Sequence, residues 1–509
     1  MPRTAISAMR QHKQYDESMN FFSKKSRELD KKIVLVVVLI FVGIFTIIVS
    51  RAATPTASIQ PENGVKSGNY TLSPNASASG GSSVRFGGST VSCGKRVQNY
   101  SYQVPFGNAV WNQPVCNLPL HPKSANYASR FYNYANGLNV TPAPGGYGKG
   151  NLGVKFGLDP DPYKSFGRNV FYASDSTQEK AIWANNGTSN LDGDDVPQTD
   201  YRRFTPNRKI PWNPDWKTGL GGDNEIVILE DRNSPPAGLA PKGSLYEISG
   251  YRPPDQATLL CGLFLNPYNL QTYPGRLCSY NVNILRNADT GAIADYRTYE
   301  GSSDSRGGGI SMYATLTTPE EVDAGEIRHA LGLGLFNTAF GPACSTAQLN
   351  TAAEGETCGT AIAPASKFEW GSGPRSGDAA NLLVNQTIPE GMRFRLKAPQ
   401  AEIENWISSQ GFSAAKERTA RIFIRALQDY GAIIVDTGGV SQIQVAAGYN
   451  PEARALWAKN GIVDDSDKRF LFGLFNETSM EVIAPPTNNC ITGVASKYFC
   501  KYLTSKYGN

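Results

Sequence analysis

Short stretches in which apolar residues alternate with polar ones, or run together without charge, recur along the chain from residue 225 onward. Alternation with a period of two is typical of strands, because successive side chains point to opposite faces of a sheet. The clearest stretches predict strands over residues 225–230, 243–249, 327–335, 392–397 and 432–436.

One segment instead follows the period of a helix. Residues 413–430 place apolar side chains on a single stripe, Ser413 can cap the first turn, and Gly431 can end the last. A short helix is predicted to begin after Thr318, which is followed by a proline suited to the first helical position. The pattern therefore predicts a mainly β fold, an antiparallel β-sandwich or jelly-roll-like domain with one or two packed helices.

The longest apolar run predicts a transmembrane helix near the N-terminus. Residues 33–49 carry no charge, and a helix of that length rises roughly 25 Å, slightly short of the hydrocarbon core. Lysines and arginines cluster before this segment, and only Arg51 follows it closely. The positive-inside rule then places residues 1–32 in the cytoplasm as a basic tail and the rest of the chain outside.

Two fates of this segment stay open. As an uncleaved anchor, it would leave the protein attached to the membrane and facing the extracellular side. As the apolar region of a signal peptide, it would be removed after Ala52, because Ser50 and Ala52 are the small residues that signal peptidase prefers. The protein would then be secreted.

The net charge of +5 does not indicate a nucleic-acid partner. Residues 1–32 contain eight lysines and arginines and four acids, so they account for +4 of the total. The remaining chain is close to neutral and has no basic stripe, which excludes nucleic acid as an expected partner.

Eight cysteines all follow the apolar segment, as expected for a disulfide framework outside the cytoplasm. They are Cys93, Cys116, Cys261, Cys278, Cys344, Cys358, Cys490 and Cys500. They form four pairs of sequence neighbours, although eight cysteines allow 105 connectivities. No pair has the spacing of a zinc ligand motif.

Two segments resemble known families. Residues 61–64 and 77–87, within a Gly/Ser-rich stretch over residues 50–92, are similar to the opening strands of small jelly-roll carbohydrate-binding modules. A β-rich stalk is the alternative for this stretch. Residues 93–509 are expected to form one large extracellular β-rich domain. The motifs in this domain resemble a family of secreted bacterial proteins, and they cover residues 110–125, 324–331, 391–397 and 420–438.

The second resemblance implies extracellular placement beside immunoglobulin-like or sugar-binding modules, without an established activity. The chain departs from the family at two places. The family usually has Asp-Arg-His where this chain has residues 223–225, Asp-Asn-Glu, and Trp-Pro-Ala-Arg-His where it has residues 363–367, Ala-Pro-Ala-Ser-Lys. Activity that depends on those histidines is in doubt here.

His329, Glu326 and Arg328 form the sharpest candidate catalytic cluster. On the predicted strand, His329 would share a face with Leu331, while Glu326 and Arg328 share the other. A histidine base beside cationic groups suits a polysaccharide lyase, because abstracting a proton next to a carboxylate requires that its charge be neutralised. The alternative is a core histidine with a nearby Glu–Arg pair.

Candidate substrate-binding residues lie on a predicted strand and in a proline-rich loop. They are Arg393, Arg395, Lys397 and His121. The alternatives are a solvated basic strand face and a histidine that packs a turn. A glycosidase would instead need two carboxylates across a cleft. Glu225, Glu247, Glu326 and Asp436 are available, and Asp436 could simply cap the turn after its strand.

No cofactor is expected, although the acidic loop at residues 191–195 is a candidate calcium ligand or a solvated loop. The serine-esterase, zincin and phosphate-binding motifs are absent from the sequence. The resulting prediction is a cell-surface or secreted protein whose partner is an extracellular glycan, acting as a lyase or hydrolase through His329. The alternative is a non-catalytic surface protein for adhesion or glycan binding.

Overall fold

The computed structural model of the 509-residue chain describes residues 70–74 and 82–86 and, with gaps, residues 109–485. The longer gaps are residues 136–146, 185–208, 254–276, 286–305, 340–360 and 366–385. The chain divides into two compact units, Met1–Val91 and Ser92–Asn509. Residues 1–49, the expected tail and membrane segment, lie outside the described residues. Within the described ranges, no helix has the length and apolar character needed to cross a membrane.

The first unit contains a two-stranded antiparallel ladder. β1 (Tyr70–Pro74) pairs with β2 (Ser82–Phe86), and Leu72 lies opposite Val84. Both strands fall in the stretch that resembles the opening of a carbohydrate-binding module. A ladder of this size fits both that resemblance and a β-rich stalk, so both stay predictions.

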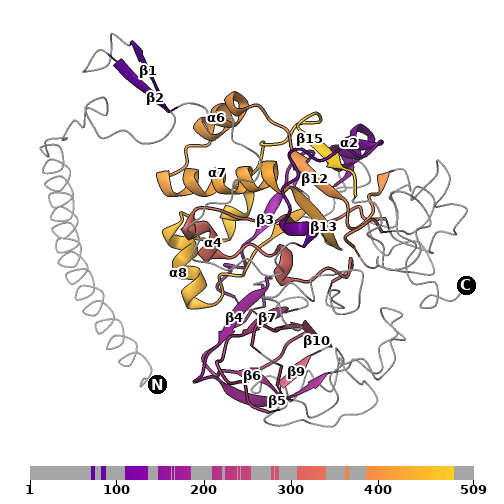
Figure 1. Cartoon of the computed structure of the whole chain (residues 1–509), viewed down its shortest axis with the longest axis vertical. Helices are drawn as coiled ribbons and strands as arrows, with labels where there is room; N and C mark the ends of the chain where they lie inside the picture. Colours follow the sequence, from indigo (N-terminus) through magenta and orange to yellow (C-terminus); the bar gives the residue numbers. More distant parts are fainter. Residues whose placement is uncertain are drawn as a thin grey trace, which may run out of the picture. The chain divides into compact units, whose positions relative to one another are not determined.

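The largest sheet of the second unit has six strands in the order β15-β12-β13-β11-β14-β3 (Figure 1). Its strands are β3 Gly153–Lys155, β11 Leu331–Leu335, β12 Arg393–Leu396, β13 Ala432–Thr437, β14 Gln442–Gln444 and β15 Met480–Ile483. β11 is parallel to β13, and β14 is parallel to β3. The other neighbours are antiparallel.

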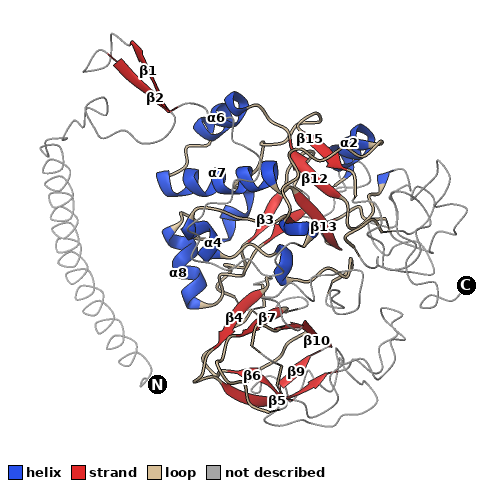
Figure 2. Cartoon of the chain, in the orientation of Figure 1, coloured by secondary structure: helices blue, strands red, loops and turns tan. Residues whose placement is uncertain are grey.

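Helices pack against one face of this sheet. They include α2 Ser124–Tyr134, α6 Gln400–Ser409, α7 Ala414–Asp429 and α8 Pro451–Lys459, which surround its strands in Figure 2. Phe423 and Leu427 of α7 are fully buried with Phe394 of β12 and Ile434 of β13. The apolar stripe predicted for residues 413–430 is therefore the face that α7 buries.

The opposite face of β13 packs on a second sheet. Ile433 and Val435 are fully buried with Val227 and Leu245, which belong to a four-stranded sheet in the order β10-β8-β7-β4. Its strands are β4 Asn169–Ala173, β7 Ile226–Glu230, β8 Leu245–Ser249 and β10 Asn281–Leu285. Burial on both faces explains why the first four residues of β13, Ala432 to Val435, are all apolar.

The four-stranded sheet is also buried on its second face. Ile226 and Ile228 of β7 share a core with Ile182 and Leu277 of a three-stranded sheet, whose order is β6-β5-β9. Its strands are β5 Gln178–Ala184, β6 Lys209–Trp212 and β9 Leu277–Ser279. β4 pairs with β7, and β5 with β9, in the parallel direction.

Each of the five expected strands is present at least in part, but their pairing differs from the expectation. Four strand pairs are parallel, so the expected antiparallel arrangement is wrong for them. The described residues also contain more α-helices than the one or two expected. Strand direction depends on long connections, which local periodicity does not report. A sandwich or jelly-roll arrangement stays a prediction.

Both expected helix starts are confirmed. Ser413 caps α7 by accepting a hydrogen bond from Lys416 N. Thr318 caps α4 (Pro319–Ala324) in a capping box, in which Glu321 accepts a hydrogen bond from the Thr318 amide. Gly431 follows the end of α7, and its φ of 72° lies in the left-handed region.

His329 lies before β11, not on it. The strand begins at Leu331, so the expected sharing of a strand face by His329 and Leu331 is wrong. Just before β11 the main chain is not paired with a strand of the sheet, because the Ala330 amide donates to Trp111 O. The ring is buried, with Nε2 at 3.2 and 3.3 Å from the two carboxylate oxygens of Glu321.

The pKa of His329 is raised above its usual value of 6.5. Burial acts in the opposite direction and lowers the pKa, as does the charge of Arg393. The negative charge of Glu321 and the hydrogen bonds to Glu321 and Ala330 outweigh both effects. His329 is therefore paired with the carboxylate that caps α4.

Of the eight cysteines, the structure describes Cys116 and Cys278, and both are disulfide-bonded. The described residues contain no free cysteine. Cys93, Cys261, Cys344, Cys358, Cys490 and Cys500 lie outside the described residues. The expected pairing of sequence neighbours therefore stays a prediction.

The end of α7 can be tested with two glycines of similar φ. A Cβ on Gly431 would lie 2.3 Å from Phe394 O, whereas a Cβ on Gly411, with φ 64°, meets nothing within 4 Å. Gly411→Ala is expected to cost about 1–2 kcal/mol of unfolding free energy from the left-handed backbone alone. Gly431→Ala is expected to cost clearly more in denaturant unfolding, and equal costs would contradict the close contact.

The pairing of His329 predicts a pH dependence of stability. Because the folded pKa is raised, the stabilisation is complete below the unfolded value of 6.5 and is lost as pH rises through the folded pKa. The difference in unfolding free energy between the wild type and His329→Gln should therefore shrink as the pH rises above 6.5. A constant difference over this range would show that the charged pair contributes nothing.

Candidate functional site

The basic row on β12 binds main-chain groups of the protein itself. Arg393 is buried, and its guanidinium donates to four carbonyl oxygens, those of Tyr430 at 2.7 Å, Val110 at 2.8 Å, Gln113 at 2.8 Å and Trp111 at 3.4 Å. Burial lowers its pKa to about 9, so it keeps its charge at neutral pH. These contacts fasten the segment around Trp111 to β12.

Arg395 continues the same arrangement. It donates to Glu481 at 2.7 and 2.9 Å and to the carbonyl oxygens of Val115 and Cys116 at 2.9 and 2.6 Å. Lys397 lies 2.7 Å from Glu481, and its side chain is 65% exposed. Of the expected substrate-binding row, only Lys397 therefore presents its charge mainly to solvent.

The other expected site residues do not form one site, because they have separate partners within the chain. Glu326 and Arg328 form an ion pair of 3.2 Å with each other. His121 is buried beside Tyr127, and its Nδ1 accepts a hydrogen bond from Lys123 N at 3.0 Å. Burial, followed by the charge of Lys123, lowers the pKa of His121 to about 4. Neither His121 nor His329 lines the cavities of about 330 and 390 Å³ among the described residues.

Three carboxylates and two arginines converge between the six-stranded and four-stranded sheets, and we call this group the charged cluster. It consists of Arg168, Glu225, Glu247, Arg306 and Asp436. The first four residues are at most 6% exposed, and the side chain of Asp436 is 20% exposed. Three of the four carboxylates that the sequence offered for a glycosidase pair are therefore brought together.

Arg168 joins two of these carboxylates. Its Nη2 lies 2.6 Å from Glu225 Oε2 and 3.4 Å from Asp436 Oδ2. Because both distances are measured from the same nitrogen, the two carboxylate oxygens are at most 6.0 Å apart. A single guanidinium thus holds two acids from different sheets close together.

Strand direction explains why these residues meet. Arg168 and Glu225 immediately precede β4 and β7, which are parallel and pair Asn169 with Ile226. The two side chains therefore start from the same edge of the four-stranded sheet. Asp436 lies near the carboxyl end of β13, beside the parallel strand β11. The carboxyl ends of parallel strands are where α/β sheets commonly bind ligands.

A glycine-rich loop completes the surroundings of Asp436. Gly307 N donates to Asp436 Oδ1 at 3.2 Å, and Gly308 N donates to Val435 O at 2.9 Å. A Cβ on Gly308 would lie only 3.0 Å from Val435 O, so glycine allows the loop to follow β13 closely. The loop thus contacts the Asp436 carboxylate through the Gly307 amide.

Arg306 is the member whose donors are least used. It is 2% exposed, and its Nη2 donates to Met312 O at 3.2 Å. Its Nε and Nη1 have no acceptor among the described residues. Burial, followed by repulsion from Arg168, lowers its pKa to about 9, and the three carboxylates of the cluster offset only part of this effect. A charged group with spare donors can bind an oxygen of a ligand.

Glu247 supports the cluster from the middle of β8. Its Oε1 accepts hydrogen bonds from Ser311 Oγ at 2.5 Å and from Tyr313 N at 3.1 Å. These contacts hold the segment that follows the glycine-rich loop against the four-stranded sheet. Glu247 is fully buried, so it holds this segment in place without facing solvent.

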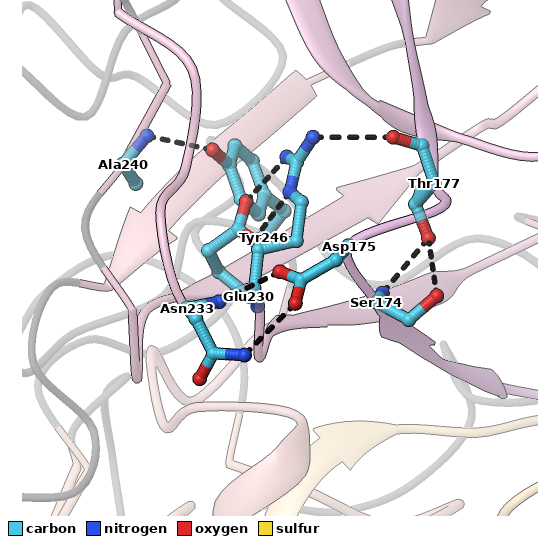
Figure 3. A network of polar contacts seen from close by, with 8 residues as sticks. Ser174, Asp175, Thr177, Glu230, Asn233, Ala240 and Tyr246 are labelled. Atoms are coloured by element: carbon cyan, nitrogen blue, oxygen red, sulfur yellow. Dashed lines mark hydrogen bonds and ion pairs between the residues drawn. The ribbon is translucent and has the colours of Figure 1, made fainter.

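A second polar network, at the carboxyl ends of β4 and β7, differs from the charged cluster (Figure 3). Arg232 donates to both oxygens of Glu230 at 2.7 and 2.6 Å and to Thr177 O at 3.3 Å. The hydrogen bonds to Glu230 raise the pKa of Arg232 above its usual value. Asp175 accepts two hydrogen bonds from Asn233. These groups are matched within the chain, which indicates a structural role.

Sequence reasoning identified the carboxylates of the cluster but missed Arg168 and Arg306. Arg168 precedes an unremarked strand, and its neighbours show no motif. The signal that could have found Arg306 is the run of three glycines that follows it, because such a run marks close approach of the main chain.

Among the described residues, no group of three or more His, Cys, Asp and Glu side chains is placed to hold a metal ion. The expected calcium ligands at residues 191–195 lie outside them. Comparisons with protein-family models, curated proteins and solved structures find no match to this chain.

Proposed function

We propose that this protein hydrolyses a glycosidic bond of an extracellular polysaccharide, with Glu225 and Asp436 as its carboxylate pair. The observation that carries the proposal is their separation of at most 6.0 Å across Arg168. Retaining glycosidases hold their two carboxyl groups about 5–5.5 Å apart, and inverting enzymes hold them about 6.5–9.5 Å apart. The separation supports a retaining reaction.

The surroundings of the two acids suggest their roles. Glu225 is the more buried and the closer to Arg168, as suits a nucleophile oriented by an ion pair. It would form a bond to the anomeric carbon as the bond to the leaving oxygen breaks. Asp436, the more exposed acid, would give its proton to that oxygen. It would then take a proton from the water that releases the sugar.

The unused donors of Arg306 also support this proposal. Its unused Nε and Nη1 donors are buried beside both acids, where they can hold a substrate oxygen. A donor that is already desolvated contributes more to stabilising developing negative charge than one in water. The expected lyase chemistry of His329 has less support, because the ring is held by Glu321 and its pKa is raised, whereas a base must be uncharged.

The proposed location is the cell surface or the extracellular medium. The apolar segment at residues 33–49 would anchor the chain or direct its secretion, and the disulfide bonds of Cys116 and Cys278 suit an oxidising compartment. Non-catalytic glycan binding is the second candidate, because a buried carboxylate pair with little exposure can also be a structural ion network.

Hydrolysis can be tested with the full chain over a panel of polysaccharides, by measuring new reducing ends. Glu225→Gln and Asp436→Asn are each expected to lower turnover by about 10²–10⁴-fold, because each removes a proton-transfer or nucleophilic group. The matched controls are Glu404→Gln and Asp465→Asn, which change surface ion pairs and are expected to keep turnover.

Thermal unfolding of every variant shows whether lost turnover reflects lost folding. The anomeric configuration of the first product, followed by NMR, is expected to match that of the substrate. Wild-type binding without new reducing ends would favour the adhesion candidate. An unsaturated uronate product that is lost in His329→Gln but not in Glu225→Gln would overturn the hydrolase proposal in favour of a lyase.

A further inference from the structure

A hollow of about 330 Å³ lies on the surface where β4 meets the starts of α4 and α8, and we call it the acidic hollow. α4 and α8 lie beside one another in Figure 1. The lining residues that matter for its chemistry are Phe171, Tyr172, Asp215, Trp216, Glu320 and Glu452. It shares no residue with the charged cluster, so it is a separate candidate site.

One wall of the acidic hollow is aromatic and rigid. Trp216 stacks on the buried ring of Phe171, with 4.7 Å between ring centroids and 9° between the ring planes. Tyr172 is next along β4 and is 40% exposed. Successive strand side chains point to opposite faces, so Tyr172 lies across β4 from Phe171 and Trp216. Trp216 is therefore the aromatic face offered to a ligand, and the stacking fixes its orientation in advance.

The other walls carry negative charge without a matching positive side chain. Asp215, Glu320 and Glu452 line the hollow, and its lining includes no lysine, arginine or histidine. Glu320 and Glu452 lie in the first turns of α4 and α8. Each helix start contributes at most about half a positive charge, so three carboxylates leave the hollow negative.

The titration of Glu320 agrees with an excess of negative charge. Burial, followed by the charges of Glu321 and Glu452, raises its pKa, although its own main chain and Thr318 donate hydrogen bonds. Burial, followed by the charges of Glu320 and Glu321, raises the pKa of Tyr172. The acids also do not converge as a metal site does, because no such group exists among the described residues.

We propose that the acidic hollow binds an organic ammonium ion, with the cationic nitrogen between the carboxylates and its carbon skeleton against Trp216. Aromatic faces attract ammonium groups through the ring quadrupole, and carboxylates supply the opposing charge. Neutral sugars would gain the stacking contact but not the charge contact. A metal ion would gain the charge contact but not the aromatic one. The ligand class is thus an amine that also carries an apolar or sugar ring face.

The test is calorimetric titration of the full chain with glucosamine, choline, glucose and calcium chloride. Glucosamine or choline is expected to bind, and glucose, which matches glucosamine without the amine, is expected not to. Binding of glucosamine alone identifies an amino sugar, and binding of choline alone identifies a quaternary ammonium group. Equal binding of glucosamine and glucose, binding of calcium at the hollow, or no binding of either amine overturns the proposal.

Variants locate the binding in the hollow. Glu320→Gln, Glu452→Gln and Trp216→Leu are each expected to weaken amine binding about tenfold, and the surface control Glu404→Gln is expected to leave it unchanged. Binding should also weaken as pH falls through the raised pKa of Glu320. Unchanged affinity in all three variants, with thermal unfolding like that of the wild type, contradicts the site. Glu225→Gln distinguishes this proposal from hydrolysis. The variant is expected to lose turnover but to keep amine binding unchanged.

Discussion

The burial of β13 on both faces is the constraint on which the second unit depends. Ile434 packs toward the helices, and Ile433 and Val435 pack toward the four-stranded sheet. Such a strand has no solvated face, so every polar group near its end must find a partner inside the protein. Asp436 is the first polar side chain after this run, and its surroundings follow from that requirement. Arg168, the loop amide of Gly307 and partial solvent exposure together satisfy its carboxylate.

Burial also distinguishes arginines that stabilise the fold from an arginine that is available to a ligand. Arg393 and Arg395 lie on β12, on the opposite side of β13 from β11, and both donate to main-chain carbonyl oxygens of the segment around Trp111. Removing such donors would destabilise the fold, because hydrogen bonds between a buried charge and the main chain would be lost. Arg306 is as deeply buried, yet two of its donor nitrogens have no acceptor among the described residues. Burying these donors without acceptors lowers the stability of the fold. Such a cost is expected at a site that binds a ligand.

Local sequence signals predicted local structure well and pairing poorly. Ser413, Thr318 and Gly431 act through hydrogen bonds or φ values set within a few residues, so their roles could be read directly. His329 could not, because its partner Glu321 is reached only after α4 turns the chain back. The direction of β11 relative to β13 depends on about a hundred intervening residues, and no periodicity encodes it.

In the candidate site, too, individual residues could be predicted from the sequence but their spatial arrangement could not. Glu225, Glu247 and Asp436 could be proposed because acids at strand ends or within apolar runs are rare and conspicuous. That they meet was unpredictable, since it requires the amino ends of β4 and β7 to face the carboxyl end of β13 across two sheets. The expected histidine chemistry rested on the sequence cluster of Glu326, Arg328 and His329 and on a predicted strand face. Burial gives that chemistry less support, since His121 and His329 both contact partners within the chain, whereas Asp436 alone in the charged cluster remains partly open to solvent.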